Sequence, residues 1–145
     1  MSGKFFLDSN ILVYGQDARH PEKQRRAQAL AAQLVEAGNG VISTQVLQEF
    51  YVAATGKIGV APLAAKAVLK AFSAFEIVQV TPELVQEAVD CSILNRVSFW
   101  DALIAAAAAA AGCTLLYSED FNSGQTLLGV KVVDPFAAEG KRPRA

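Results

Sequence analysis

The sequence predicts an α/β fold in which helices cover both faces of a central parallel sheet of about five strands, giving three layers in the order α/β/α. Two observations support this prediction. Several short apolar runs lack the alternation of a half-exposed strand, which is typical of strands buried on both faces. These runs alternate with longer helical segments, as in parallel sheets. With 145 residues, 52% of them hydrophobic, the chain is large enough to bury a full core.

Five strands and five helices are expected to follow one another along the chain. Apolar runs predict the strands at residues 4–8, 40–42, 77–80, 114–117 and 130–133. Helical periodicity and end signals predict the helices at residues 21–37, 44–54, 62–75, 82–94 and 98–111. We find no internal repeat and no long linker, so we expect a single domain over residues 1–138. Residues 139–145 are expected to be a disordered tail.

Turn and capping residues set the expected boundaries of these elements. A polar loop is expected between the first strand and the first helix, which has Pro21 in its first turn. Ser43 or Thr44 is expected to cap the second helix, and Thr55-Gly56 to end it. Ser98 opens the last helix, which contains seven consecutive alanines. Because alanine combines high helix propensity with little bulk, we expect this helix to approach its neighbours closely.

Cysteine, histidine and hydropathy patterns limit the kind of protein. No uncharged apolar run approaches the ~20 residues of a membrane span, and no secretory signal is recognisable, so we expect a cytoplasmic protein with no membrane partner. Cys91 and Cys113 lie in apolar contexts and are expected to be buried thiols in a reducing compartment. The single histidine, His20, argues against a histidine-based zinc site or catalytic triad.

The formal net charge of −1 argues against broad, purely electrostatic binding to nucleic acid. Two local basic clusters nevertheless occur, one in the first expected helix and one in the tail. They consist of Lys23, Arg25 and Arg26, and of Lys141, Arg142 and Arg144. Two interpretations remain open. The clusters are either a solvated helix face and a frayed chain end, or a surface that follows a phosphate backbone.

Four acidic residues are expected to meet at one edge of the sheet. Ligands of such sheets bind beyond the carboxyl ends of the strands, near the point where strand order reverses. Asp8 ends the first strand, and Asp120 follows the fourth. Glu49 lies in the helix after the second strand, and Asp101 in the first turn of the helix before the fourth. Carboxylates gathered without cations repel one another unless they bind a hard divalent cation, and Mg²⁺ or Mn²⁺ fits an all-oxygen site.

Each of these acidic residues also has a purely structural interpretation, which the sequence leaves open. Asp8 can cap the turn that follows its strand. Glu49 shares a helix face with two glutamines, as on a solvated surface. Asp101 lies three residues after the capping serine, the acidic position of a capping box. Asp120 is in an expected loop, where acidic residues are common.

Four ordered segments resemble the PIN-domain family. Their order and spacing are similar to the VapC ribonuclease toxins of bacterial type II toxin–antitoxin modules, and the resemblance extends over residues 4–136. The ordered set is more specific than any one segment. The segments are Phe6-Leu7-Asp8-Ser9-Asn10, Gln48-Glu49-Phe50, Ser98-Phe99-Trp100-Asp101-Ala102-Leu103-Ile104 and Leu116-Tyr117-Ser118-Glu119-Asp120-Phe121.

This resemblance implies a PIN-like fold and an endoribonuclease that depends on Mg²⁺ or Mn²⁺, together with a homodimer and an antitoxin partner. The implied catalytic and metal-binding residues are Asp8, Glu49, Asp101 and Asp120. Asn10 and Ser118 match polar positions that orient carboxylates or water. Glu119 is an alternative ligand to its neighbour, but the family pattern of hydroxyl, any residue and Asp favours Asp120.

Two other interpretations remain. A haloacid-dehalogenase-like phosphatase also has an Asp at the end of its first strand, but that class needs a second Asp where Asn10 stands and a Lys before its last acidic residues. Neither requirement is clearly met. A non-catalytic PIN-like binding module is the third interpretation, and the intact set of four acidic residues argues against it.

Overall fold

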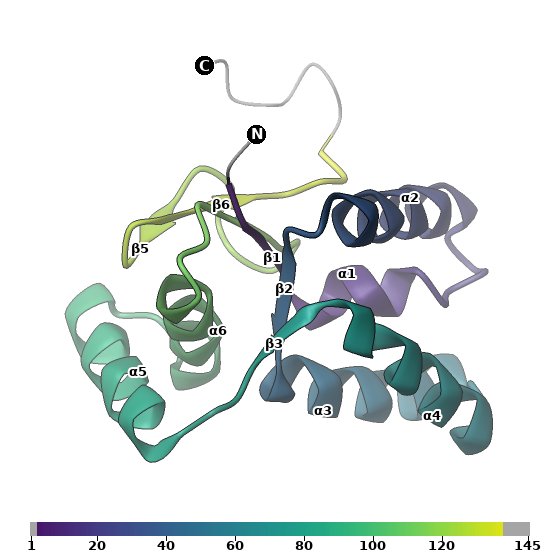
Figure 1. Ribbon diagram of the computed structural model, residues 1–145, viewed down its shortest axis with the longest axis horizontal. Helices are drawn as coiled ribbons and strands as arrows, with labels where there is room; N and C mark the ends of the chain where they lie inside the picture. The colour runs from purple at the N-terminus through teal and green to yellow at the C-terminus, as the bar shows by residue number, and fades with distance from the viewer. Residues whose placement is uncertain (1–2, 138–145) are drawn as a thin grey trace.

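A six-stranded sheet in the order β3-β2-β1-β4-β6-β5 runs through the centre of the molecule (Figure 1). The computed structural model describes residues 3–137. The strands are β1 Phe5–Leu7, β2 Gly40–Ser43, β3 Glu76–Val78, β4 Leu115–Tyr117, β5 Thr126–Leu127 and β6 Val130–Val133. All neighbouring strands are parallel except β5 and β6, which are antiparallel. The five predicted strands are present, with β3 beginning and ending slightly earlier than expected.

Helices cover both faces of the sheet, which confirms the predicted α/β/α layers. They are α1 Ser9–Tyr14, α2 Pro21–Ala37, α3 Thr44–Ala53, α4 Pro62–Ala71, α5 Pro82–Asn95 and α6 Phe99–Ala110, with a 3₁₀ turn at Phe72–Ala74 after α4. Figure 1 shows α5 and α6 on one side of the sheet and α1 and α2 on the other. Helix α3 starts directly where β2 ends, so its first turns lie at the carboxyl edge of the sheet.

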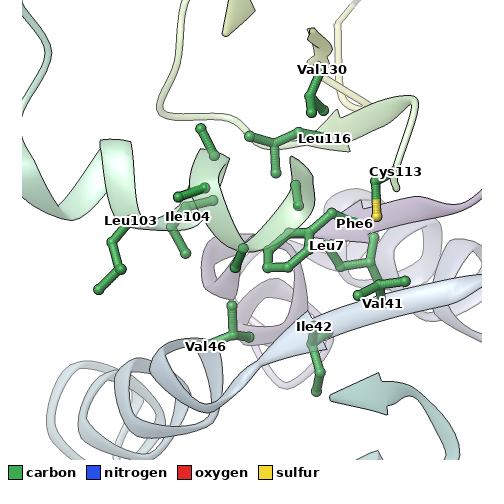
Figure 2. Packing of buried hydrophobic residues seen from close by; sticks show 14 of the residues in the cluster. Phe6, Leu7, Val41, Ile42, Val46, Leu103, Ile104, Cys113, Leu116 and Val130 are labelled. Atoms are coloured by element: carbon green, nitrogen blue, oxygen red, sulfur yellow. The ribbon is translucent and has the colours of Figure 1, made fainter. Parts of the chain in front are cut away.

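The central strand β1 explains why its sequence is apolar without alternation. It is paired with β2 on one side and β4 on the other. Successive side chains of a strand point to opposite faces, and helices cover both faces here. Phe6 and Leu7 are accordingly both fully buried. Figure 2 shows them among side chains of β2, β4 and α6, and each such burial contributes roughly 1.5–3 kcal/mol.

The alanine-rich helix α6 lies in the core, as its composition predicted. Ala105, Ala106, Ala107 and Ala108 are all fully buried, so the helix has neighbours on every side along this stretch. Ala110, near its end, is exposed. A longer side chain at the buried positions has no room, because protein interiors are close-packed.

The expected polar loop after β1 is wrong, because residues Ser9–Tyr14 form helix α1. Asp8 caps this helix by accepting a 2.7 Å hydrogen bond from the backbone N–H of Ser9. Ile11 and Leu12 are buried against the core. An apolar run this short cannot be assigned to helix or strand from periodicity alone.

Helix α3 ends at Ala53, close to the expected end near residue 54, but Thr55-Gly56 does not end the helical segment. The chain continues beyond Ala53 as a π-helix, Ala54–Ile58, in which the glycine is an interior residue. It ends at Gly59, whose φ of 85° is a left-handed conformation that glycine adopts without strain. The sequence offers both glycines as stop signals, and only the packing selects the second one.

The strand that was not predicted, β5, forms a hairpin with β6 through Leu128 and Gly129. Both residues have positive φ, 51° and 81° respectively, which tight hairpin turns require. A leucine in this conformation is uncommon, and the usual turn residues Asn and Asp are absent. Of the usual two-residue hairpin turn, the sequence therefore has the glycine but not the Asn or Asp before it.

Several further expectations concern burial and the chain ends. Cys91 and Cys113 are buried, unpaired thiols as predicted. No single helix within residues 3–137 is long and apolar enough to cross a membrane; α5 and α6 pass that test only as a pair bent by 117°. The predicted disordered tail, with Lys141, Arg142 and Arg144, lies outside the described residues.

Candidate active site

The reversal of strand order lies between β1 and β4, and the residues that follow these two strands meet there. The register pairs Leu7 with Tyr117, so the next residues along, Asp8 and Ser118, are opposite each other. Ser118 Oγ donates a 2.7 Å hydrogen bond to Asp8 Oδ2. This is the switch point at which ligands of open α/β sheets bind.

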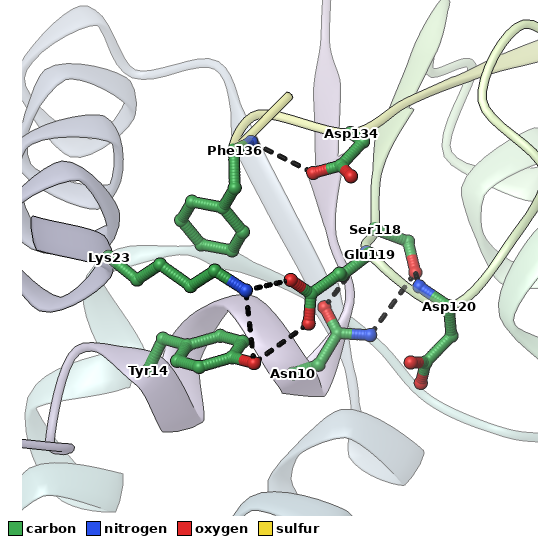
Figure 3. A network of polar contacts seen from close by, with 8 residues as sticks. All are labelled: Asn10, Tyr14, Lys23, Ser118, Glu119, Asp120, Asp134 and Phe136. Atoms are coloured by element: carbon green, nitrogen blue, oxygen red, sulfur yellow. Dashed lines mark hydrogen bonds and ion pairs between the residues drawn. The ribbon is translucent and has the colours of Figure 1, made fainter. Parts of the chain in front are cut away.

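The Ser118 hydroxyl is the centre of a small polar network (Figure 3). Besides donating to Asp8, its oxygen accepts hydrogen bonds from Asn10 Nδ2 at 3.2 Å and from the backbone N–H of Asp120 at 3.1 Å. Asn10 Oδ1 accepts the backbone N–H of Glu119 at 3.3 Å. The start of α1 is thereby tied to the loop after β4. Ser118 thus holds a carboxylate, and Asn10 holds the loop after β4.

Glu49 reaches the site from α3 and is held by two side chains that the sequence analysis did not single out. Ser9 Oγ donates to Glu49 Oε1 at 2.9 Å, and Gln45 Nε2 donates to Oε2 at 3.0 Å. Gln45 is buried, and its amide also donates to the backbone carbonyl of Trp100 at 3.2 Å. Gln45 Oε1 is buried without a hydrogen-bond partner among the described residues. The face of α3 that carries Glu49 is therefore not a simple solvated surface.

Asp101 lies in the first turn of α6, where it is half-buried. Its backbone N–H donates to Ser98 Oγ at 3.1 Å, so the predicted serine cap is present. Burial raises the pKa of the Asp101 carboxyl, and the charges of Asp120 and Glu49 raise it further, while a hydrogen bond from Ser98 opposes them. This segment therefore has the predicted serine cap, and its Asp101 is also affected by the charges of two other predicted site residues.

Asp8 shows the strongest electrostatic effect in the site. It is 5% exposed, and burial is the main cause that raises its pKa from 3.8 to about 6. Hydrogen bonds from Ser118 and from the Ser9 backbone oppose this increase, whereas the charges of Glu49 and Asp120 add to it. Glu49 and Asp120 therefore lie close enough to disfavour the charged forms of both Asp8 and Asp101.

The two neighbouring acidic residues after β4 point in different directions. The Glu119 carboxylate forms an ion pair with Lys23 and accepts a 2.9 Å hydrogen bond from the Tyr14 hydroxyl. Within the described part of the chain, the Asp120 carboxylate accepts no hydrogen bond, and it is exposed. Figure 3 shows it turned away from the Lys23 group. Geometry thus favours Asp120 over Glu119 as the residue free to bind a ligand.

A cleft of about 240 Å³ opens beside these residues and is lined by Ser9, Asn10, Glu49 and Asp120 among others. All of the predicted acidic residues offer oxygen atoms only. Across residues 3–137, no three Asp, Glu, His or Cys side chains are arranged as a ready-made metal site.

Comparison with known proteins identifies the family. The profile of the PIN domain matches residues 5–123, which is most of the chain. The chain belongs to the PIN-domain family. No protein among those with curated functions matches the sequence.

Solved structures with the same PIN fold include three from bacteria, all with distant sequences. A Mycobacterium tuberculosis VapC toxin described as cleaving the sarcin–ricin loop is 24% identical, with a TM-score of 0.62 over 88% of this chain and 99% of its own. DNA-bound VapBC from Salmonella typhimurium is 19% identical, with a TM-score of 0.66 over 92% and 98%. A Klebsiella pneumoniae toxin–antitoxin complex is 21% identical, with a TM-score of 0.65 over 93% and 100%. These likenesses confirm the predicted resemblance to VapC-like folds.

Sequence reasoning missed several residues around this PIN-domain site. Ser9 and Gln45 hold Glu49, and Lys57 lines the cleft from the π-helix. The spacing of Gln45 four residues before Glu49 is a usable signal, since such residues are neighbours on a helix. The basic cluster of α2 does not lie free: Lys23 pairs with Glu119, and its two arginines bind Glu22 and the Pro135 carbonyl.

Proposed function

We propose that this PIN-domain chain is an endoribonuclease that depends on Mg²⁺ or Mn²⁺ and serves as the toxin of a toxin–antitoxin module. The observation that carries the proposal is that acidic residues from distant segments gather at the switch point of the sheet, beside the paired ends of β1 and β4. Burial raises the pKa values of Asp8 and Asp101, and the charges of Glu49 and Asp120 raise both further. Such an arrangement is unfavourable without a bound cation.

The donor chemistry fits a hard divalent cation. Asp8, Glu49, Asp101 and Asp120 are the residues that would hold it, and their oxygens are the ligands that Mg²⁺ and Mn²⁺ prefer. When bound, the metal would activate a water molecule and stabilise charge on a phosphodiester.

The other polar residues of the site keep the carboxylates in place. Ser118 and the Ser9 backbone each bind one oxygen of Asp8, which limits the rotation of its side chain. The Ser9 hydroxyl and Gln45 do the same for Glu49. Asn10 ties the loop that carries Asp120 to α1. Catalytic groups fixed in this way lose little entropy when substrate binds.

The proposed substrate and partners rest on family and fold. The structural neighbours include a toxin that cleaves the sarcin–ricin loop and complexes of toxin with antitoxin. They support an RNA substrate and an antitoxin partner for this chain. Exposed apolar side chains at the end of α5, Ile93 at 69% and Leu94 at 80%, support a homodimer or another protein contact. We place this activity in the cytoplasm, where RNA and antitoxin would be present.

Cleavage of RNA by the purified protein tests the proposal. Total bacterial RNA would be incubated with Mn²⁺ or with EDTA, and new 5′ ends would be mapped by sequencing. We expect discrete cuts with the metal, none with EDTA and none with Asp8→Asn or Asp101→Asn. Asp90→Asn on the exposed side of α5 is the matched control and is expected to cleave normally. Cleavage that survives in both site variants would sink the assignment.

A parallel assay with a chromogenic phosphomonoester separates the phosphatase interpretation. Asn10 occupies the position at which that class needs a second Asp, and its amide is engaged by Ser118 and the Glu119 backbone. We therefore expect no release of phosphate from the monoester. Release that requires Asp8 would favour the phosphatase, and inactivity in both assays would favour a non-catalytic binding module.

A further inference from the structure

The π-helix that continues α3 brings one basic side chain to the carboxylate cleft. Glu49, Ala53 and Lys57 all line this cleft, although they are spread over two helical segments. In a regular α-helix each step of four residues rotates the side chain by about 40°, so residues spaced by four share a broad face and drift gradually across it. The hydrogen bonds of a π-helix span five residues, which makes the turn wider and reduces this rotation. π-Helical turns inside helices are frequently found at functional sites.

The position of this turn is fixed by the core. Ala54 is fully buried, and its carbonyl accepts the backbone N–H of Gly59 and that of Val60, the latter at 2.9 Å. Gly59 ends the segment in a left-handed conformation, and Val60 packs against the core. Lys57 therefore projects from an anchored turn and not from a loose loop.

Lys57 also differs from the other basic residues near the site. Arg19 is paired with Asp17 through two guanidinium nitrogens, and Lys23 is paired with Glu119. Lys57 is exposed and, within residues 3–137, takes part in no ion pair or hydrogen bond. Among the described residues it is the only basic side chain that lines the cleft. Its charge is therefore not neutralised by an ion pair among the described residues. It lies beside carboxylates that would repel a polyanion.

From this arrangement we infer that Lys57 binds a backbone phosphate of the RNA as the strand enters the carboxylate cleft. The inference rests on the proposed nuclease function and adds a substrate-binding residue to it. A cation at the edge of an acidic cleft compensates part of the repulsion between RNA and carboxylates. An ammonium group on a flexible stem suits a phosphate, which needs no particular approach direction. Since phosphates are alike along the strand, Lys57 contributes affinity and not sequence preference.

The size of the effect follows from counterion release. One phosphate contact with single-stranded nucleic acid contributes about 0.7 to the slope of log affinity against log salt concentration. At about 0.1 M salt this corresponds to roughly a fivefold change in affinity. Loss of the charge should weaken binding by that factor at low salt and by less at high salt. A residue with only a structural role would not change the salt slope.

The experiment compares Lys57→Gln, Lys57→Arg and the matched control Lys66→Gln, which removes an exposed lysine from α4, outside the cleft lining. Cleavage kinetics would use a labelled oligonucleotide that spans a mapped cleavage site, with Mn²⁺, over a series of potassium chloride concentrations. We expect Lys57→Gln to raise KM about fivefold with a small change in kcat, and to lower the salt slope by about 0.7. Lys57→Arg should restore both values, and Lys66→Gln should match the wild type.

A binding measurement separates failure of this inference from failure of the proposed function. Fluorescence anisotropy of a short labelled single-stranded RNA would be recorded in the cleavage-inactive Asp101→Asn background with Mg²⁺, with and without Lys57→Gln. If the wild type does not cleave but Lys57→Gln still lowers the affinity and its salt slope, the nuclease proposal fails and the contact stands. If the wild type cleaves and Lys57→Gln leaves KM, affinity and salt slope unchanged, the contact is refuted. Thermal melting of every variant verifies that it is folded.

Discussion

Ser118 donates a 2.7 Å hydrogen bond to Asp8 across 110 residues of sequence, and the same oxygen accepts two more hydrogen bonds, from Asn10 and from the Asp120 backbone. Ser118→Ala removes all three. We expect a loss of about 1–3 kcal/mol in the free energy of unfolding, because buried groups lose their partner. The pKa of Asp8 should rise further above 6, since this hydrogen bond lowers it.

Urea denaturation and carboxyl ¹³C NMR titration would measure these two quantities. Ser92→Ala is the control, because the Ser92 hydroxyl makes only an exposed hydrogen bond within α5. We expect it to change stability by less than about 0.5 kcal/mol. Equal losses in the two variants, or an unchanged pKa of Asp8, would contradict the central role of the Ser118 hydroxyl.

Glu119 and Asp120 are adjacent, and their contacts predict opposite effects on activity. Glu119 is engaged by Lys23 and Tyr14, whereas the Asp120 carboxylate accepts no hydrogen bond from a described residue. We expect Glu119→Gln to keep Mn²⁺-dependent RNA cleavage and to lose at most about 1 kcal/mol of stability, because the ion pair is partly exposed. Asp120→Asn should abolish cleavage and leave the fold intact. Initial rates and urea midpoints test both, and the reverse pattern would make Glu119 the active residue.

Repulsion within the acidic group predicts a gain in stability from a substitution. The pKa of Asp101 is raised by burial, by Asp120 and by Glu49, so its charged form is disfavoured in the folded protein. In EDTA at neutral pH, Asp101→Asn should therefore melt at a temperature equal to or higher than that of the wild type. Added Mg²⁺ should stabilise the wild type and not the variant, since only a bound ion shifts the folding equilibrium. If neither Mg²⁺ nor Mn²⁺ changes the melting temperature of the wild type, the proposed metal binding is contradicted.

The parts of the site that follow strand ends could be predicted from the sequence. Parallel strands deliver their carboxyl ends to one edge, so Asp8 and Ser118 were predictable as neighbours once both strands were recognised. The order of acidic and hydroxyl residues along the chain predicted the other members of the candidate site. The sequence predicted Asn10 as a polar residue of the site. Its contact with the Glu119 backbone depends on helix α1, where a loop was expected.

The residues that were missed depend on packing and not on local sequence. Lys57 reaches the cleft from a π-helix in which the chain passes through Gly56 and stops at Gly59. Both glycines are equally good stop signals, and the choice is made by burial of Ala54 and the hydrogen bond to Val60. Similarly, Gln45 is one of two glutamines on α3, and its amide contacts the first turn of α6 at the Trp100 carbonyl. Pairwise contacts of this kind leave no periodic pattern in one chain.

The pair between Asp17 and Arg19 predicts how stability depends on pH. Asp17 is buried, and hydrogen bonds from Arg19 are the main cause that lowers the pKa of its carboxyl from 3.8 to about 2. Because the folded-state pKa lies below the unfolded one, this pair stabilises the fold above about pH 4, and the effect disappears as pH falls toward about 2. Arg19→Gln should lower stability at neutral pH and make stability depend less on pH between about pH 4 and about pH 2.

Urea midpoints measured from about pH 2 to about pH 7 would show this weaker dependence of stability on pH. Arg25→Gln is the matched control, since Arg25 pairs with Glu22 where both side chains are about two-thirds exposed. Exposed pairs contribute little, so the control should follow the wild-type curve. If Arg19→Gln also follows that curve, the pair does not stabilise the folded state.

Helix α6 offers the cleanest test of the packing itself, because two of its alanines differ only in burial. Ala106 is fully buried, whereas Ala110 is exposed near the end of the same helix. Ala106→Leu must displace neighbouring side chains in a close-packed core, and we expect it to lower the free energy of unfolding by about 1–3 kcal/mol. Ala110→Leu should change it by less than about 0.5 kcal/mol, since both residues favour helices. Urea denaturation followed by circular dichroism measures both, and a tolerant Ala106 would mean that α6 packs more loosely than its alanines indicate.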